Sequence, residues 1–416
     1  MPRVKYITRL EQVEQVDRED LTWMKRVHAR YRFRANTYYL SLINWDDPDD
    51  PIRRIVIPDR MELEPWGRLD ASNEADVTVM PGLEHKYRDT ALLLLNKVCG
   101  GYCRFCFRKR LFIDDNEEVV RDTSEQIAYI GAHPEITNVL LSGGDALLLS
   151  TRRLRKVISA LREIPHVRII RIGSKMPAFN PYRILDDPSL ADMLGQHSSA
   201  EKRIYLMAQY NHPRELTPES LKASDILMKA GVVMCNQSPI IHGVNDDVDT
   251  LATLMRELSF VGITPYYFFQ CRPTAGNKPY DVPLTKAWRV FDRARRMVSG
   301  LAQRARFIMS HASGKIEVLA VDDEAIYLRY HRAKNPANEG RFMIMHRNDS
   351  AYWLDDLKEV ERYPGVELGV KTEAPRLVTP DLAGGAQMPG LPPKEADDGE
   401  HTGDGPFISP GVSTPQ

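Results

Sequence analysis

The chain has 416 residues, of which 43% are apolar, and its formal net charge at pH 7 is -1. This apolar content is enough for a large core in one or two domains, and the balanced charge gives no indication of a nucleic-acid partner. The first residues are charged and nowhere do eighteen apolar residues run together, so the sequence predicts neither a secretory signal nor a membrane span. We therefore expect a cytoplasmic protein.

Residues 1–84 are predicted to form an N-terminal helical region, with helices over 10–27 and 38–43. The acidic stretch 46–51 contains Pro48 and Pro51 and is typical of a turn rather than of a metal site. We interpret this region as a helical cover for the domain that follows.

From about residue 90, short apolar runs alternate with helical patterns, which predicts parallel strands joined by helical crossovers. Strands are expected at 91–96, 138–142, 167–173, 203–210, 232–240 and 264–270. Helices are expected at 120–131, 151–163, 188–195, 217–230, 247–260 and 284–300. We therefore predict an α/β fold with six β/α units, in which functional residues lie on the loops that leave the strand ends.

The last part of the chain differs in composition from this β/α domain, which we assign to residues 85–320. Residues 321–373 are predicted to form a small extension with strands near 342–345 and 351–354. From residue 374 to 416 the chain is rich in proline and glycine, which is typical of a disordered tail.

Three cysteines, Cys99, Cys103 and Cys106, follow the first of these strands and are separated by three and then by two residues. Three thiolates from one short loop can bind three irons of a four-iron cluster and leave the fourth iron open to a ligand. A structural zinc site is the alternative, but such sites usually have four ligands and no fourth ligand lies nearby in the sequence. Thiolate-bound iron needs a reducing compartment, and we interpret Cys235 and Cys271 as buried apolar residues.

The cysteine spacing is the signature of radical S-adenosylmethionine enzymes, and the motifs that follow it resemble those of the lysine 2,3-aminomutase family over most of residues 30–320. These motifs are Ser142-Gly143-Gly144-Asp145, Arg171-Ile172-Gly173-Ser174, Asn211-His212-Pro213, Asn236-Gln237-Ser238, Tyr266-Tyr267, Gln270-Cys271 and Ser313-Gly314-Lys315. The resemblance implies a partial (β/α)6 TIM-like barrel of the radical S-adenosylmethionine fold. It also implies a 4Fe-4S cluster, S-adenosyl-L-methionine, pyridoxal 5′-phosphate, an electron donor of flavodoxin or ferredoxin type, and a homo-oligomer.

The segment from Ser142 to Asp145 ends the second predicted strand, where Gly143 and Gly144 allow a ligand to approach the backbone. By resemblance, this segment holds the amino group of S-adenosylmethionine. His212 and Gln237 lie in two of the other motifs and are expected to bind cofactor. The alternative is an ordinary glycine turn in which Asp145 caps a helix.

Lys86 and Tyr87 resemble the stretch of the family that holds the phosphate of pyridoxal phosphate. Thr90 stands where the family usually has a second arginine, and Arg88 is the residue expected to replace that arginine. The alternative is a solvated charged turn.

Lys315 is, by resemblance, the lysine that forms a Schiff base with pyridoxal phosphate. Such a lysine must lose its proton, which burial and a neighbouring cation favour. The run of glycines that the family has before this lysine is reduced here to Gly314, so an ordinary Gly-Lys pair is the alternative.

Two arginines are expected to bind the substrate. Arg108 matches the family arginine that pairs with the α-carboxylate of an amino acid, although a basic helix start is an alternative. Arg272 stands where members that act on lysine have an aspartate, and a cation there disfavours a cationic substrate side chain. Our hypothesis is an acidic substrate such as glutamate, and the alternative is that Arg272 is a surface or structural arginine.

The resemblance thus implies an isomerase, namely a pyridoxal-phosphate-dependent radical S-adenosylmethionine enzyme that moves an amino group from Cα to Cβ of an amino acid. Two other functions stay open. The first is a radical enzyme of the same fold without pyridoxal phosphate, acting on another small molecule or a peptide, which Thr90 and the short glycine run favour. The second is an iron–sulfur protein without turnover.

Overall fold

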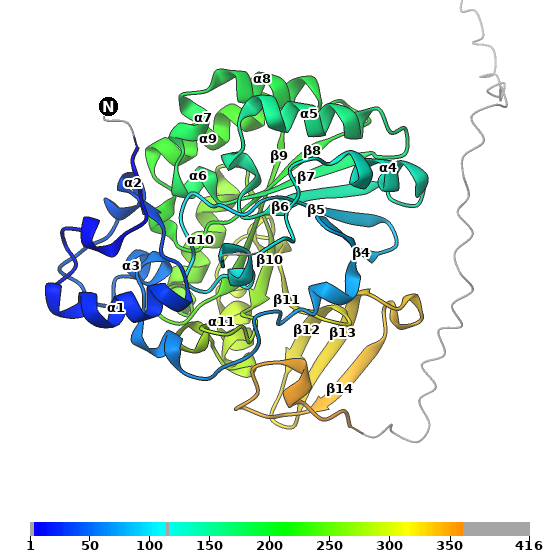
Figure 1. Ribbon diagram of the computed structural model, residues 1–416. Coiled ribbons are helices and arrows are strands. Elements are labelled where there is room, and N and C mark those ends of the chain that lie inside the picture. The colour runs from blue at the N-terminus through cyan, green and yellow to red at the C-terminus, as the bar shows by residue number, and fades with distance from the viewer. Residues whose placement is uncertain (1–3, 114–115, 361–416) are drawn as a thin grey trace, which may run out of the picture. The chain divides into compact units, whose positions relative to one another are not determined.

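The computed structural model describes residues 4–113 and 116–360 of the chain (Figure 1). It has a mixed α/β fold with one twelve-stranded sheet, in which each strand lies beside the next strand along the chain, so that β3 and β14 are the edges. The strands are β3 (Thr78–Met80), β4 (Leu83–Tyr87), β5 (Thr90–Asn96), β6 (Asn138–Gly143), β7 (Ile169–Ser174), β8 (Ile204–Ala208), β9 (Val233–Ile240), β10 (Thr264–Gln270), β11 (Arg306–His311), β12 (Gly314–Val321), β13 (Ala325–Ala333) and β14 (Phe342–His346). The predicted tail lies outside the described residues.

Strands β5 to β11 run parallel to one another and form the centre of the sheet. Helices follow each of the strands β5 to β10, which confirms the predicted alternation. These helices are α4 (Ser124–Ala132), α5 (Thr151–Arg162), α6 (Met176–Phe179), α7 (Tyr182–Leu185), α8 (Pro188–Gln196), α9 (Pro218–Lys229), α10 (Val248–Phe260) and α11 (Leu284–Arg296). In the described part of the chain, every helix is too short or too polar to cross a bilayer.

The two faces of the parallel strands differ in what they contact. In the first part of β6 and β7 alternate residues, namely Val139, Leu141, Ile170 and Ile172, are fully buried and apolar and belong to the main hydrophobic core. The residues between them, such as Ser142 and Arg171, are only half-buried and line a cavity on the other face. Because successive side chains of a strand point to opposite faces, this alternation gives the sheet one packed and one hollow side.

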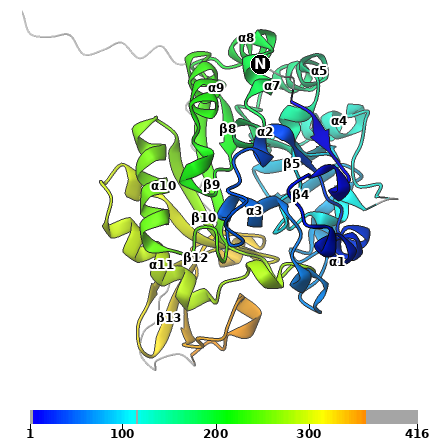
Figure 2. The ribbon, with the colours of Figure 1, turned by 90° about the vertical axis from the view of Figure 1, so that its left-hand side faces the viewer.

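The N-terminal region contains helices α1 (Arg18–Arg30), α2 (Thr37–Leu40) and α3 (Pro51–Val56), and the short strands β1 (Tyr6–Ile7) and β2 (Ala35–Asn36). Figure 2 shows α1 on the right of the sheet and α10 on the left. Residues 1–84 were predicted to be helical, but β1, β2 and β3 lie within this range and β4 begins in it.

The prediction of one helix over residues 10–27 is wrong. A short 3-10 turn ends at Gln12, Val13 has an extended backbone, and α1 begins only after Asp17. Leu10, Val13 and Val16 are all buried in a second, N-terminal core, and this irregular path buries them together. The predicted turn at 46–51 is confirmed, and the Asp50 side chain accepts hydrogen bonds from two backbone N–H groups to cap α3.

The C-terminal part adds strands that the sequence analysis missed. β11 pairs in parallel with β10, and β12 to β14 continue the sheet with antiparallel pairing. The strand expected near 342–345 is confirmed as β14, but the one expected near 351–354 is wrong. There the Asp356 carboxylate accepts hydrogen bonds from the N–H groups of Tyr352 and Trp353, and the chain forms a turn instead.

Candidate functional site

A cavity of about 570 Å³ lies on the hollow side of the parallel strands. Each of the strands β5 to β11 contributes at least one residue to its wall, as do β4, β12 and β13. Of the site residues expected from the sequence, those that line the cavity are Lys86, Tyr87, Cys99, Cys103, Cys106, Arg108, Ser142, Gly143, Gly144, Asp145, Gln237, Arg272 and Lys315. His212 is not among them, and its Nδ1 accepts a hydrogen bond from the N–H of Arg214 within its own turn.

The cysteine loop is held against the N-terminal region through its backbone. The Arg34 side chain donates a hydrogen bond of 2.8 Å to the carbonyl of Cys99, and Asn36 donates one of 3.0 Å to the carbonyl of Gly100. Gly100 packs closely on Met176, whose sulfur would lie 2.7 Å from an added Cβ. These contacts fix the backbone of the loop and leave the thiols directed to the cavity.

The donor set on this loop suits an iron–sulfur cluster. Residues 4–113 and 116–360 hold no group of three His, Cys, Asp or Glu side chains arranged around one ion. A four-iron cluster does not need such a group, because each thiolate binds a different iron. Burial raises the pKa of all three thiols, so binding of iron must displace their protons.

A buried ion pair anchors the loop between Cys103 and Cys106. Arg104 donates hydrogen bonds of 2.9 and 2.7 Å to the two carboxylate oxygens of Glu62, and both side chains are at most 2% exposed. The Arg104 guanidinium also donates hydrogen bonds to the carbonyl oxygens of Tyr31 and Arg32. The loop is therefore tied to the N-terminal region by a fully paired arginine.

We expect Glu62→Gln to lower the free energy of unfolding by about 3–5 kcal/mol, because it leaves the Arg104 cation buried without its counter-ion. The matched control is Glu11→Gln, which breaks the ion pair with Lys25 between two half-exposed side chains and should leave the free energy of unfolding nearly unchanged, because solvent screens this pair. Urea unfolding of the full chain measures both values. Equal losses in the two variants would contradict the anchoring role.

The Asp145 carboxylate is hydrogen-bonded to other groups of the protein. It accepts hydrogen bonds from the N–H groups of Leu147 and Lys175 and from the Ser174 hydroxyl, and thus caps a short turn. Burial raises its pKa to about 6. The capping alternative thus describes these three hydrogen bonds, but Asp145 also lines the cavity, so its binding of a cofactor stays a prediction.

Gly143 is required by the fold at the end of β6. Its φ is +116°, and an added Cβ would lie 2.4 Å from the carbonyl oxygen of Asn96. The glycine therefore allows the end of β6 to touch the chain that leads from β5 to the cysteines. It brings Ser142 and the thiols to one end of the cavity.

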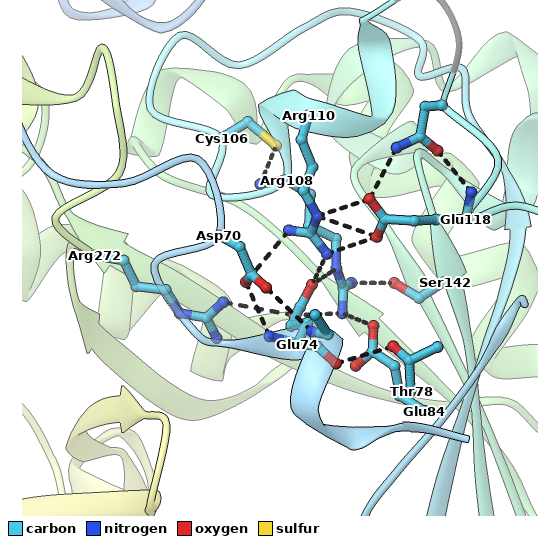
Figure 3. Close-up of polar contacts among 12 residues, drawn as sticks. Asp70, Glu74, Thr78, Glu84, Cys106, Arg108, Arg110, Glu118, Ser142 and Arg272 are labelled. Atoms are coloured by element: carbon cyan, nitrogen blue, oxygen red, sulfur yellow. Dashed lines mark hydrogen bonds and ion pairs between the residues drawn. The ribbon is translucent and has the colours of Figure 1, made fainter. Parts of the chain in front are cut away.

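A network of arginines and carboxylates forms another part of the wall (Figure 3). Arg108 binds Glu74 through two hydrogen bonds of 3.0 and 2.9 Å and donates a third to Ser142. Arg110 also binds Glu74, and Arg272 lies 3.9 Å from it. Burial alone would raise the pKa of Glu74, but the three arginines outweigh it and hold this pKa below its usual range.

Three polar atoms of this network lack a hydrogen-bond partner among the described residues. They are Oε1 of Glu84, which is 3.6 Å from Arg108, and one terminal nitrogen each of Arg110 and Arg272. Burial raises the pKa of Glu84 and lowers the pKa of Arg272 to about 10, which leaves Arg272 a cation at pH 7. Arg272 also stacks on the ring of Phe107 at 3.7 Å. The cavity wall thus presents a cation with unused hydrogen-bonding capacity.

Lys315 lies on β12 and lines the cavity. Its amine is 5.4 Å from the ring centre of Tyr267 and 5.0 Å from that of Phe269. Burial lowers its pKa well below the usual value, and Arg272 and Arg171 lower it further. A lowered pKa favours the uncharged amine, which is the form that attacks a carbonyl group.

Sequence reasoning missed several residues of the wall. Glu74 and Glu84 belong to no motif, and His331 and Arg332 come from β13, where no strand was expected. Arg171 was part of a motif but had no assigned role. Arg88, the residue expected to replace the arginine missing at Thr90, is exposed to solvent and does not line the cavity.

None of the protein-family models that were compared with the chain matches it. Curated proteins, in contrast, align with most of its length. The chain is 56% identical to a protein of Aquifex aeolicus named "Putative L-lysine 2,3-aminomutase", over 86% of this chain and 96% of that one. It is 36% identical to the L-lysine 2,3-aminomutase of Clostridium subterminale, over 72% of this chain and 71% of the other.

A relative with a different substrate in its name is almost equally similar. The glutamate 2,3-aminomutase of Clostridioides difficile is 32% identical, over 72% of this chain and 70% of its own length. Enzymes with these names are isomerases. The extent and level of these similarities show that the chain belongs to the lysine 2,3-aminomutase family and that it is an isomerase of the aminomutase type.

Proposed function

We propose that this aminomutase is a radical S-adenosylmethionine enzyme that depends on pyridoxal phosphate, and that its parallel strands are the partial (β/α)6 barrel of such enzymes. One observation carries the proposal. Three thiols on one loop and a buried lysine whose pKa is lowered line the same cavity, although about two hundred residues separate Cys106 from Lys315. A structural zinc site or a passive iron–sulfur protein would not require that lysine.

The residues of the cavity divide into two sets. Cys99, Cys103 and Cys106 would hold the cluster, and the segment 142–144 with Gln237 would contact S-adenosylmethionine. Lys315 would hold pyridoxal phosphate through its amine. When bound, the cluster with S-adenosylmethionine supplies one-electron chemistry for removing a hydrogen atom, and pyridoxal phosphate supplies a conjugated ring that delocalises electrons.

The protein itself binds and orients the substrate and excludes water. Arg108 has five N–H donors, of which Glu74 and Ser142 use three, so two remain for the α-carboxylate of an amino acid. Arg272 has a terminal nitrogen that makes no hydrogen bond within the described residues, although it lies 3.9 Å from Glu74, and Arg272 would bind a second carboxylate. We therefore propose an acidic amino acid, such as glutamate, as the substrate.

The proposal includes an electron donor of flavodoxin or ferredoxin type, a homo-oligomeric enzyme and a cytoplasmic location. Its direct test is anaerobic reconstitution of the full chain with iron and sulfide, followed by incubation with S-adenosylmethionine, pyridoxal phosphate, a reductant and single amino acids. We expect 5′-deoxyadenosine and a β-amino isomer, and neither from Cys103→Ala. Formation of 5′-deoxyadenosine without any β-amino acid would favour the radical enzyme without pyridoxal phosphate. Absence of 5′-deoxyadenosine would contradict both.

A further inference from the structure

β13 departs from regular pairing beside Lys315. Lys315 is opposite Arg332, but the next residue, Ile316, is opposite Tyr330, so that His331 is an extra residue between them. An extra residue in one strand of an antiparallel pair is a β-bulge, which changes the direction of the side chains at that point. His331 and Arg332 are consecutive, yet both line the cavity.

A short hydrogen bond fixes the bulge. Nε2 of His331 lies 2.6 Å from the hydroxyl of Tyr267, and that hydroxyl also accepts a hydrogen bond of 3.0 Å from Tyr266. Burial lowers the pKa of His331 to about 4, so its ring is neutral at pH 7. The hydrogen bond between His331 and Tyr267 holds the bulge to β10.

Arg332 reaches from the bulge to the segment that precedes β5. Its guanidinium carbon is 4.8 Å from the ring centre of Tyr87 and one of its nitrogens binds Asp89. The amine of Lys86 is 5.8 Å from the centre of the same ring. Two cations from strands far apart in the sequence therefore flank one tyrosine in the cavity wall.

Positive charge exceeds negative charge at this end of the cavity. Lys86, Arg171, Arg272 and Arg332 all act on Lys315, as shown by their contributions to its lowered pKa. Asp89 pairs with Arg332, but its side chain is half exposed and it does not line the cavity. Glu74 and Glu84 are carboxylates of the same wall, and Glu74 is already paired with Arg108 and Arg110. The cations in excess of these carboxylates indicate a site for an anion, and Arg in particular suits the geometry of a phosphate group.

We propose that Arg332, directed by the bulge at His331, completes with Lys86 and Tyr87 a site for the phosphate of a phosphorylated carbonyl cofactor bound at Lys315. The inference rests on the proposed function, since it assumes that Lys315 binds such a cofactor. Arg332 then supplies the cation that Thr90 lacks and that Arg88, exposed to solvent, does not provide. In this proposal the antiparallel strands β12 and β13 form part of the cofactor site as well as extending the sheet.

The test compares pyridoxal phosphate with pyridoxal, which has the same carbonyl group and no phosphate. The full chain with its reconstituted cluster is titrated with each compound, the product is trapped with borohydride, and labelled Lys315 is quantified by mass spectrometry. In the unmodified protein we expect half-saturation at a concentration about 10- to 100-fold lower for pyridoxal phosphate, since a bond to a charged group is worth about 1.5–3 kcal/mol. Arg332→Gln should remove most of this preference and leave labelling by pyridoxal unchanged.

The matched control is Arg329→Gln on the same strand, which changes an arginine that pairs with Glu317 away from the cavity. It should keep the preference of the unmodified protein. If Arg332→Gln is labelled at Lys315 and still prefers pyridoxal phosphate over pyridoxal as strongly as the unmodified protein does, the role of Arg332 is overturned. The proposed function would then stay intact. Failure of both compounds to label Lys315 in the unmodified protein would overturn the use of pyridoxal phosphate and the inference with it. Labelling by pyridoxal in Arg332→Gln also shows that this variant is folded.

Discussion

Replacing Lys315 with alanine is expected to lower formation of the β-amino acid by at least roughly a thousandfold, which is the scale seen when a group that forms a covalent intermediate is removed. The physical reason is the burial of this amine among cations, which lowers its pKa and so favours the uncharged, nucleophilic form. The measurement is product formation by the reconstituted enzyme under anaerobic conditions, together with borohydride trapping. The cluster should be unaffected, so iron content should equal that of the unmodified protein.

Lys86 provides the matched control for this prediction. It is a second lysine of the same cavity, burial lowers its pKa to about 8, and its amine donates a hydrogen bond of 2.6 Å to the carbonyl of His311. Lys86→Gln should weaken cofactor binding but still allow trapping at Lys315. If Lys315→Ala were instead labelled at Lys86 and stayed active, Lys86 would be the attachment point and our assignment would be wrong.

Reversing the charge at position 272 is expected to reverse the substrate preference. With Arg272 present, we expect kcat/KM for glutamate to exceed that for lysine. In Arg272→Asp the new carboxylate would face the side-chain carboxylate of glutamate, and like charges in a desolvated site cost several kcal/mol, or on the order of a thousandfold. The ratio of kcat/KM for the two amino acids measures the effect, because it cancels any general loss of activity.

Arg272→Gln is the control, since Arg272→Asp also places a third carboxylate near Glu74 and Glu84 and could disturb the wall. The neutral variant removes the attraction without adding repulsion, so its ratio should lie between the other two. Iron content and the unfolding midpoint report whether each variant is folded. An unmodified enzyme that converts lysine faster than glutamate would contradict the acidic substrate.

Much of the parallel sheet could be predicted because its signals are local. Apolar strands such as 138–142, and amphipathic helices such as 151–163, show their periodicity within a few residues. The run at 351–354 misled this reasoning, since the carboxylate of Asp356 binds two N–H groups that a strand would need. Local apolarity does not reveal such a competing partner.

The cavity wall was predicted only where residues lie in motifs. The cysteines and Lys315 could be named from sequence, and they line one cavity. Glu74 could not, because its role depends on meeting Arg108 and Arg110 through the fold. Arg332 could not be predicted for a different reason, because a bulge of one residue decides which face of β13 its side chain occupies.

The contacts that anchor the cysteine loop affect the order in which parts of the cavity are synthesised on the ribosome. Arg34, Asn36 and Glu62, which contact the loop, all precede it in the chain, so a ribosome delivers them before it delivers the thiols. Lys315 follows the last of these thiols by about two hundred residues. The sulfur ligands therefore emerge directly after these contacts of their scaffold, whereas the amine expected to capture a carbonyl compound is translated only about two hundred residues later.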